Sequence, residues 1–227
     1  MMKEKLIGYL SDFVTQRRLE LFDKVLGKRT RYITVVLEDI FQSHNASAVL
    51  RSCDCFGIQN IHVIENLNKF QVSPDVALGA NKWLTIYKYS RYKNNTKDCI
   101  NTLKEQGYRI VATSPHKNNS LMNDFDLAKG KTALLFGSEL HGLSKSALEL
   151  ADEFVMIPMS GFTESLNISV SAALLINYFT SLLRNDPSIN WQLSTEEKSD
   201  IKLQWLKNSI KKSDAIERLF IENQQID

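Results

Sequence analysis

Three short segments combine polar side chains with apolar neighbours in patterns that could support chemistry. They read SHNASAVLR around Asn45 and Arg51, FGSELHGLS around Gly137 and Glu139, and IPMSGFTESLN, which ends in Ser165, Leu166 and Asn167. Amide, hydroxyl, carboxylate and guanidinium groups can orient a polar substrate or assist a proton transfer. Each segment taken alone also has a simpler structural interpretation.

In the first segment, Asn45 could act only as the cap of a following helix. Arg51 lies six residues later, in a stretch rich in Ala, Val and Leu. An unpaired buried guanidinium is costly, so Arg51 must find an anion or reach water. A structural role, as an ion pair or in a surface turn, explains this position as well as a functional role does.

The second and third segments are open to two interpretations as well. Two glycines flank a carboxylate and a histidine in FGSELHGLS, and glycine permits close backbone approach to a ligand. No G-x-G-x-x-G or Walker A pattern occurs, so an ordinary turn accounts for this segment too. In the third segment Ser165 could be an N-cap with Asn167 in the first helical turn. A loop that holds an extended small molecule accounts for both side chains better.

The elements that would position these segments alternate between strand and helix. Apolar, β-branched runs predict strands, and amphipathic runs closed by glycine predict helices. The strands are expected at 32–40, 61–65, 84–89, 108–114, 132–137 and 154–159. Single helices are expected at 46–56, 95–107, 144–151 and 166–184, and one or two helices each at 3–26 and 195–225. This alternation indicates an α/β fold with a mostly parallel sheet covered on both faces. Ligands bind beyond the carboxyl ends of such strands, where the three polar segments fall.

Composition limits the class of protein. The chain has 227 residues, of which 43% are hydrophobic and 24% charged. This suits one domain of about 150–200 residues with extensions. No apolar run reaches the roughly 18 residues of a membrane span, and the start MMKEKLIGYLSDF does not resemble a signal peptide. Three cysteines, Cys53, Cys55 and Cys99, indicate reduced thiols and a cytoplasmic protein without a zinc site.

Positive charge is concentrated at the start of the chain. Residues 1–31 carry eight Lys/Arg against four Asp/Glu, whereas residues 32–185 carry 14 of each sign. A basic arm of this kind could attract phosphates. A solvated helix face is the alternative interpretation of the same residues.

Together and in this order, the three segments resemble the motifs of the SpoU family of RNA 2′-O-ribose methyltransferases, within the SPOUT class. The first motif is an Asn followed six residues later by Arg, and it matches NASAVLR at 45–51. The second matches LLFGSELHGLS at 134–144, and the third matches IPMSGFTESLNISV at 157–170. The resemblance covers residues 34–185.

The resemblance implies a fold, a cofactor and an assembly. The fold is the SPOUT α/β knot, a mostly parallel sheet flanked by helices with a deep C-terminal trefoil knot. The cofactor is S-adenosylmethionine, and no metal is implied. The assembly is a homodimer whose active site is shared across the interface.

The resemblance also assigns roles to residues of this chain. Arg51 is the residue that activates the ribose 2′-OH, although arginine is normally always protonated, and Asn45 orients Arg51. Glu139, Ser165 and Asn167 shape the catalytic pocket. The cofactor contacts are Thr113, Gly137, Ile157, Met159 and Leu166.

The layout further resembles the tRNA enzymes of the family that methylate guanosine 18 in the D-loop. It implies a basic helical arm at 1–31, a methyltransferase domain at 32–185 and a helical extension at 186–227. The segment TQRRLELFDKVLGKRTR resembles the arginine-rich arm of that subfamily, so Arg18 and Arg29 are expected to contact tRNA. The alternatives are 2′-O-methylation of ribosomal RNA and a non-catalytic RNA-binding protein with the same fold.

Overall fold

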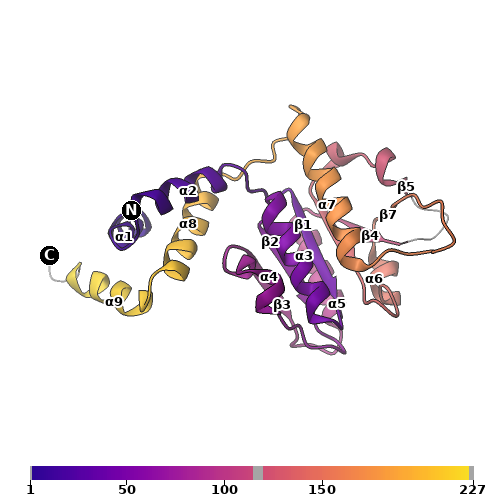
Figure 1. The fold of residues 1–227 in the computed structure, drawn as a ribbon, viewed down its shortest axis with the longest axis horizontal. Helices are drawn as coiled ribbons and strands as arrows, with labels where there is room; N and C mark the ends of the chain where they lie inside the picture. Colours follow the sequence, from indigo (N-terminus) through magenta and orange to yellow (C-terminus); the bar gives the residue numbers. More distant parts are fainter. Residues whose placement is uncertain (1, 115–119, 225–227) are drawn as a thin grey trace. The chain divides into compact units, whose positions relative to one another are not determined.

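The computed structural model describes residues 2–114 and 120–224, and it separates into two compact units (Figure 1). One unit joins the two ends of the chain, Met1–Arg29 and Gln192–Asp227. The other unit is the continuous stretch Thr30–Trp191 and contains all three polar segments.

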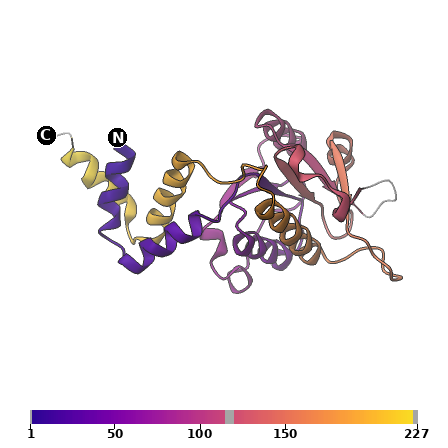
Figure 2. The same ribbon diagram turned by 90° about the horizontal axis from the view of Figure 1, so that it is seen from above.

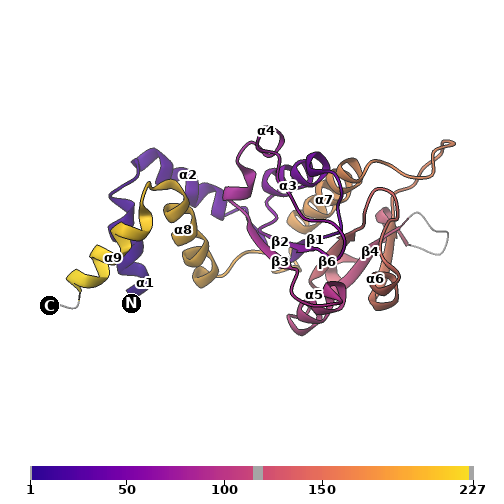
Figure 3. The same cartoon turned by 90° about the horizontal axis from the view of Figure 1, so that it is seen from below.

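The Thr30–Trp191 unit is built on a seven-stranded sheet in which every neighbouring pair of strands is parallel (Figure 3). The strands are β1 Ile33–Glu38, β2 Asn60–Ile64, β3 Thr85–Tyr89, β4 Arg109–Thr113, β5 Ser120–Leu121, β6 Thr132–Phe136 and β7 Glu153–Met156. Their order across the sheet is β3-β2-β1-β6-β4-β7-β5. The carboxyl ends of all seven strands therefore meet at one edge of the sheet.

Helices cover both faces of this sheet. On one face lie α3 Ser43–Phe56 and α7 Ile168–Asn185, and on the other lie α5 Asn95–Glu105 and α6 Lys145–Leu150. Side chains alternate along a strand, so Val35 of β1 packs with α3 and α7 whereas Val36 packs with α5 and α6. Shorter pieces complete the unit: α4 Pro74–Ala77 and 3₁₀ turns at Ala80–Lys82, Met122–Asp124 and Leu127–Lys129.

The unit formed by the chain ends is helical. It contains α1 Met2–Ser11, α2 Gln16–Leu26, α8 Thr195–Ser209 and α9 Ser213–Asn223. Helix α1 packs against α8 and α9, which Figure 2 shows in indigo beside yellow. Ser194 and Glu197 form a capping box at the start of α8. No helix in the described part of the chain is long and apolar enough to cross a lipid bilayer.

The expected α/β class and the six longer strands are present, but two helix starts differ from the predictions. Helix α3 begins at Ser43, so Asn45 lies in its first turn and does not cap it. Helix α7 begins at Ile168 with Asn167 as its cap, which leaves Ser165 outside the helix. Both differences involve residues of the polar segments. The helix starts determine the directions of the Asn45, Ser165 and Asn167 side chains.

Candidate active site

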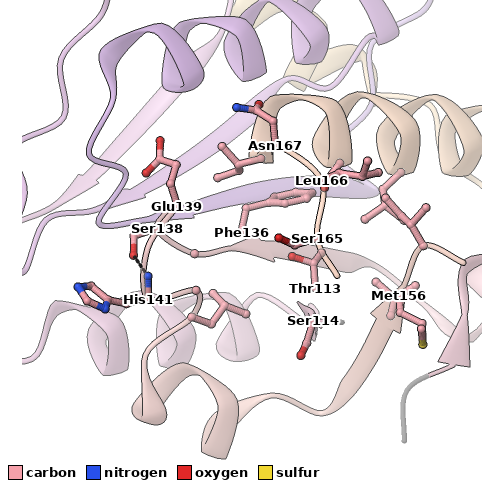
Figure 4. A pocket seen from close by; sticks show the side chains of 18 of the residues that line it. Thr113, Ser114, Phe136, Ser138, Glu139, His141, Met156, Ser165, Leu166 and Asn167 are labelled. Atoms are coloured by element: carbon pink, nitrogen blue, oxygen red, sulfur yellow. Dashed lines mark hydrogen bonds between the residues drawn. The ribbon is translucent and has the colours of Figure 1, made fainter. Parts of the chain in front are cut away.

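A cavity of about 550 Å³ opens at the carboxyl ends of β4, β6 and β7 (Figure 4). Its wall consists of strand ends, the loop 137–143 after β6, the loop 157–167 after β7 and the first turns of α7. Ligand sites in proteins measure about 300–1,000 Å³, so this cavity has room for a cofactor-sized molecule.

The loop after β6 turns back tightly on its own start. The N–H of Ser138 donates to the Gly142 carbonyl oxygen at 3.0 Å, and the N–H of Gly142 donates to the Ser138 carbonyl oxygen at 2.9 Å. A Cβ atom on Gly137 would lie 2.1 Å from the carbonyl carbon of Gly142, which no real contact allows. Glycine is therefore required at position 137, because the turn leaves no space for a side chain.

Three polar side chains, one from each segment, meet at the rim of this cavity. The Asn45 amide nitrogen donates to Glu139 Oε1 at 2.7 Å, and the Asn167 amide nitrogen donates to Asn45 Oδ1 at 3.2 Å. Glu139 also accepts the backbone N–H groups of Phe41 and Gln42 at 3.3 and 3.4 Å. The structure thus joins residues that lie up to 122 positions apart in the chain.

These hydrogen bonds decide the protonation state of Glu139. Burial would raise the pKa of Glu139, but the hydrogen bonds from Asn45, Phe41 and Gln42 outweigh burial and hold this pKa below its ordinary value. Glu139 is therefore ionised at neutral pH. A carboxylate of low pKa is a weak proton acceptor, so this residue is suited to fixing Asn45 and the loop after β1.

The lowered pKa of Glu139 predicts a pH-dependent contribution to stability. The contribution is present above the pKa of an unfolded glutamate and is lost as the pH falls through the lower folded pKa. Glu139→Gln should therefore destabilise the protein at pH 7 and differ less from wild type at pH 3, in urea unfolding at both pH values. Glu149→Gln on the surface of α6 is the matched control for loss of one charge. An equal difference at both pH values would contradict the predicted role of the carboxylate.

Ser165 and Asn167 differ in their position relative to the start of α7. Asn167 Oδ1 accepts the Ser169 N–H at 2.8 Å and the Ser169 hydroxyl at 2.6 Å, as a helix cap does. Ser165 lies on the loop and lines the cavity, and its hydroxyl makes no hydrogen bond to the residues that the structure describes. The Ser165 hydroxyl therefore remains available to a ligand in the cavity.

The five residues that are expected to contact the cofactor all line this cavity. They are Thr113, Gly137, Ile157, Met159 and Leu166. The Thr113 hydroxyl is already used, because it donates to the Leu135 carbonyl oxygen at 2.7 Å. Sequence reasoning missed Ser114 and Met156, which also line the cavity. Their positions at the ends of β4 and β7 are the signal that could have found them.

Arg51 is the predicted site residue that the structure places elsewhere. It is exposed on α3 and does not line the cavity, and its side chain makes no hydrogen bond or ion pair within the described ranges. The prediction that Asn45 orients Arg51 finds no contact to support it within one chain. Six helical residues correspond to about 600° of rotation, so the two side chains leave α3 in directions about 120° apart.

The two arginines expected to contact RNA lie in contrasting environments. Arg18 is exposed near the start of α2. Arg29 is only 1% exposed, and its guanidinium carbon lies 5.3 Å from the ring centre of Trp205. This placement favours a packing role for Arg29 over the predicted contact with RNA, because a buried guanidinium cannot reach a phosphate.

Comparison with known proteins then identifies the family. The model of the SpoU rRNA Methylase family matches residues 32–177, which include all three polar segments. The chain belongs to the SpoU family. The resemblance inferred from the motifs is therefore confirmed.

Relatives within the SpoU family extend the similarity beyond the sheet. The chain is 43% identical over 215 residues to a tRNA (guanosine(18)-2′-O)-methyltransferase of Borreliella burgdorferi, covering 95% of this chain and 96% of the relative. It is 35% identical over 162 residues to the enzyme of the same name from Thermus thermophilus, covering 71% and 81%.

Solved structures of SpoU proteins share the fold. A TrmH/SpoU tRNA-modifying enzyme of A. aeolicus matches with a TM-score of 0.77 and 28% identity, over 87% of this chain and 98% of that one. The methyltransferase AviRb of Streptomyces viridochromogenes, solved with the cofactor AdoMet, matches with a TM-score of 0.60 and 23% identity, over 72% and 65%. The predicted SPOUT-type architecture is confirmed, and the trefoil knot stays a prediction.

Proposed function

We propose that this protein transfers a methyl group from S-adenosylmethionine to the 2′-oxygen of a ribose in RNA, at guanosine 18 of the tRNA D-loop. The observation that carries the proposal is the cavity at the ends of β4, β6 and β7, where the three motif segments meet. The names of the relatives supply the RNA and the nucleotide, because two of them are tRNA (guanosine(18)-2′-O)-methyltransferases.

The cavity suits S-adenosylmethionine in size and in lining. Ile157 and Leu166 offer apolar surface, and the tight turn at Gly137 brings backbone groups to the wall where no side chain fits. The part of the chain that the structure describes contains no cluster of three or more His, Cys, Asp or Glu residues that could hold a metal ion. When bound, S-adenosylmethionine supplies an activated methyl group, and the protein supplies position and charge.

The residues around the cavity can bind and orient the ribose. The free hydroxyl of Ser165 is suited to hydrogen-bond the nucleotide, and Asn167 fixes the start of α7 beside it. Glu139 and Asn45 hold the loops after β6 and β1 together. The remaining requirement is a group that activates the 2′-OH, which is a poor nucleophile on its own.

We propose that Arg51 meets this requirement from a second copy of the chain. Arg51 is exposed and lies outside the cavity of its own chain, on the helix that packs beside α7. Helix α7 exposes an apolar stripe of Val170 and Leu174, four residues apart, and Leu166 in the loop before the helix is exposed as well. A second copy would cover this stripe and could bring its Arg51 to the cavity, which supports the predicted homodimer.

The remaining predictions about organisation follow from this function. We propose 32–185 as the methyltransferase domain with its knot, 1–31 as an RNA-contacting arm and 186–227 as a helical extension. A cytoplasmic location accords with tRNA as the substrate.

Arg18→Ala should weaken tRNA binding, because Arg18 is an exposed cation of the arm. Each phosphate contact contributes about 0.7–0.9 to the slope of log K against log salt concentration, so the slope should fall by nearly one. Salt-titrated binding of a tRNA transcript measures this change. Lys211→Ala, an exposed cation outside the arm, is the matched control and should leave affinity and slope unchanged. Unchanged affinity and slope for Arg18→Ala would assign the arm to a solvated helix face.

The proposed substrate is tested by offering two RNAs in competition. The two RNAs are a tRNA transcript and ribosomal RNA, and purified protein with labelled S-adenosylmethionine should label the tRNA. A tRNA with a 2′-deoxy nucleotide at position 18 should stay unlabelled. Preferential labelling of ribosomal RNA would move the activity to the alternative substrate. Binding of tRNA without labelling of any RNA would support the non-catalytic alternative.

A further inference from the structure

One stretch of the Thr30–Trp191 unit is strongly basic although the surrounding domain is balanced in charge. Residues 76–97 contain five Lys/Arg, three tyrosines and no Asp or Glu. The stretch includes the edge strand β3 and the loop 90–94 that follows it. We define the β3 surface as Lys88, Arg91, Tyr92 and Lys93, which are all exposed.

The cations of the β3 surface have no carboxylate partner among residues 2–114 and 120–224. Arg91 and Lys93 make no ion pair with any residue in the described ranges, and Lys88 lies over the ring of Phe70 at 5.5 Å. Three other lysines of the unit do have carboxylate partners: Lys69 pairs with Glu65, Lys104 with Asp152 and Lys145 with Glu149. The β3 surface therefore presents uncompensated positive charge, which attracts phosphates.

Hydrogen bonds of Asn94 and Asn95 hold the loop that carries these residues. Asn95 is buried, and its Oδ1 accepts the Tyr92 N–H at 2.9 Å while its amide nitrogen donates to the Glu65 carbonyl oxygen at 3.0 Å. Asn94 caps α5 by accepting the Lys97 N–H at 3.0 Å. A backbone held at these points presents the Tyr92 ring, 65% exposed, at a defined position.

The β3 surface lies on the same edge of the sheet as the candidate active site. All strands are parallel, so the loop after β3 and the loop after β6 emerge at the same edge. Strands β2 and β1 separate β3 from β6, a distance of about 14 Å at three strand spacings. An RNA strand with one nucleotide in the cavity could follow this edge to the β3 surface.

Protection of an edge strand is the simplest alternative explanation. Charged residues on edge strands prevent pairing with other chains, and this accounts for Lys88. It does not account for Arg91 and Lys93, which follow the strand, nor for an exposed aromatic ring between them. Aromatic rings interleaved with cations are typical of surfaces that bind single-stranded nucleic acid.

We propose that the β3 surface is a second contact site for the substrate RNA, in which Lys88, Arg91 and Lys93 bind backbone phosphates and Tyr92 stacks on an unpaired base. The proposal rests on the proposed function, since it extends the RNA path away from the same cavity. It assigns to this edge a binding role separate from that of the N-terminal arm.

The test compares two double variants in binding of a tRNA transcript across a salt series. Arg91→Ala/Lys93→Ala should weaken binding about tenfold or more, and the slope of log K against log salt concentration should fall by about 1.4–1.8 for two lost phosphate contacts. The control Lys129→Ala/Lys131→Ala removes two exposed cations that precede β6, at the opposite sheet edge, and should leave binding nearly unchanged. Tyr92→Ala should weaken binding at least about fivefold with little change in slope.

Two parallel measurements separate this inference from the proposed function. Affinity for S-adenosylmethionine should be the same in all variants, which shows that the fold and the cavity are intact. If wild type methylates tRNA but Arg91→Ala/Lys93→Ala binds tRNA with unchanged affinity and slope, the β3 surface is only a protected edge. If wild type neither binds nor methylates tRNA, the proposed function fails, and the RNA role of the β3 surface fails with it.

Discussion

Arg51→Ala is expected to reduce methyl transfer by about 10²- to 10⁴-fold, the range of a positioned catalytic group. The reason is that the 2′-oxygen develops negative charge as its proton leaves, and a guanidinium beside it stabilises that charge. Arginine stays protonated in proteins, so we expect stabilisation of the oxygen rather than uptake of its proton. Affinity for S-adenosylmethionine should be unchanged, because the proposed role places Arg51 against the ribose 2′-oxygen and not against the cofactor.

Single-turnover methylation and equilibrium cofactor binding, measured on the same preparation, check this prediction. Cys55→Ala is the matched control, since Cys55 is exposed one turn further along α3. Methylation by Arg51→Ala at the wild-type rate would remove Arg51 from the mechanism.

A mixing experiment tests whether Arg51 acts across a dimer. Ser165→Trp should block the cavity with a bulky ring, and this variant and Arg51→Ala should each be inactive alone. Random association of equal amounts gives mixed dimers as about half of the total, each with one complete site. Co-refolded protein should therefore recover about a quarter of the wild-type activity. No recovery would indicate that Arg51 serves the cavity of its own chain.

Gly137→Ala should have the largest effect on cofactor binding. Its Cβ would lie 2.1 Å from backbone atoms of Gly142, and backbone cannot move aside as a flexible side chain can. The loop after β6 must shift to relieve this contact, which costs about 1–3 kcal/mol of stability and displaces the cavity wall. We expect affinity for S-adenosylmethionine to fall more than tenfold, measured by calorimetry, alongside a lower midpoint of thermal unfolding.

Gly161→Ala is the matched control for Gly137→Ala. Gly161 lies in the loop after β7, where a Cβ would meet no atom closer than 4.0 Å. This variant should bind S-adenosylmethionine within about twofold of wild type. If both variants behave alike, the tight turn at Gly137 does not shape the cofactor site.

Local patterns in the sequence predicted the sheet and the edge at which the site lies. Continuous apolar strands indicated a parallel sheet, and the polar segments were expected at the carboxyl ends of strands. The structure places Glu139 and Asn167 there, with Asn45 beside them. This agreement follows because strand ends and loop residues are determined by short-range periodicity.

Contacts between distant segments could not be predicted in the same way. The Glu139 carboxylate accepts a hydrogen bond from the amide of Asn45, which lies 94 positions away, and no pattern in either segment specifies that bond. The exchange of roles between Ser165 and Asn167 depends on which of two neighbouring polar residues caps α7. Burial of Arg29 depends on Trp205, which comes from the opposite end of the chain. Each of these results from tertiary packing rather than from local sequence.

The most direct test of the account is mass spectrometry of nuclease digests of an unmodified tRNA transcript after incubation with the protein and S-adenosylmethionine. We expect one 2′-O-methylguanosine, in the fragment that contains nucleotide 18 of the D-loop. The yield of this product should fall at least about 100-fold over the same incubation when Arg51→Ala replaces wild type. A wild-type digest without any 2′-O-methylated nucleotide, from protein that binds the transcript and the cofactor, would contradict the proposed reaction.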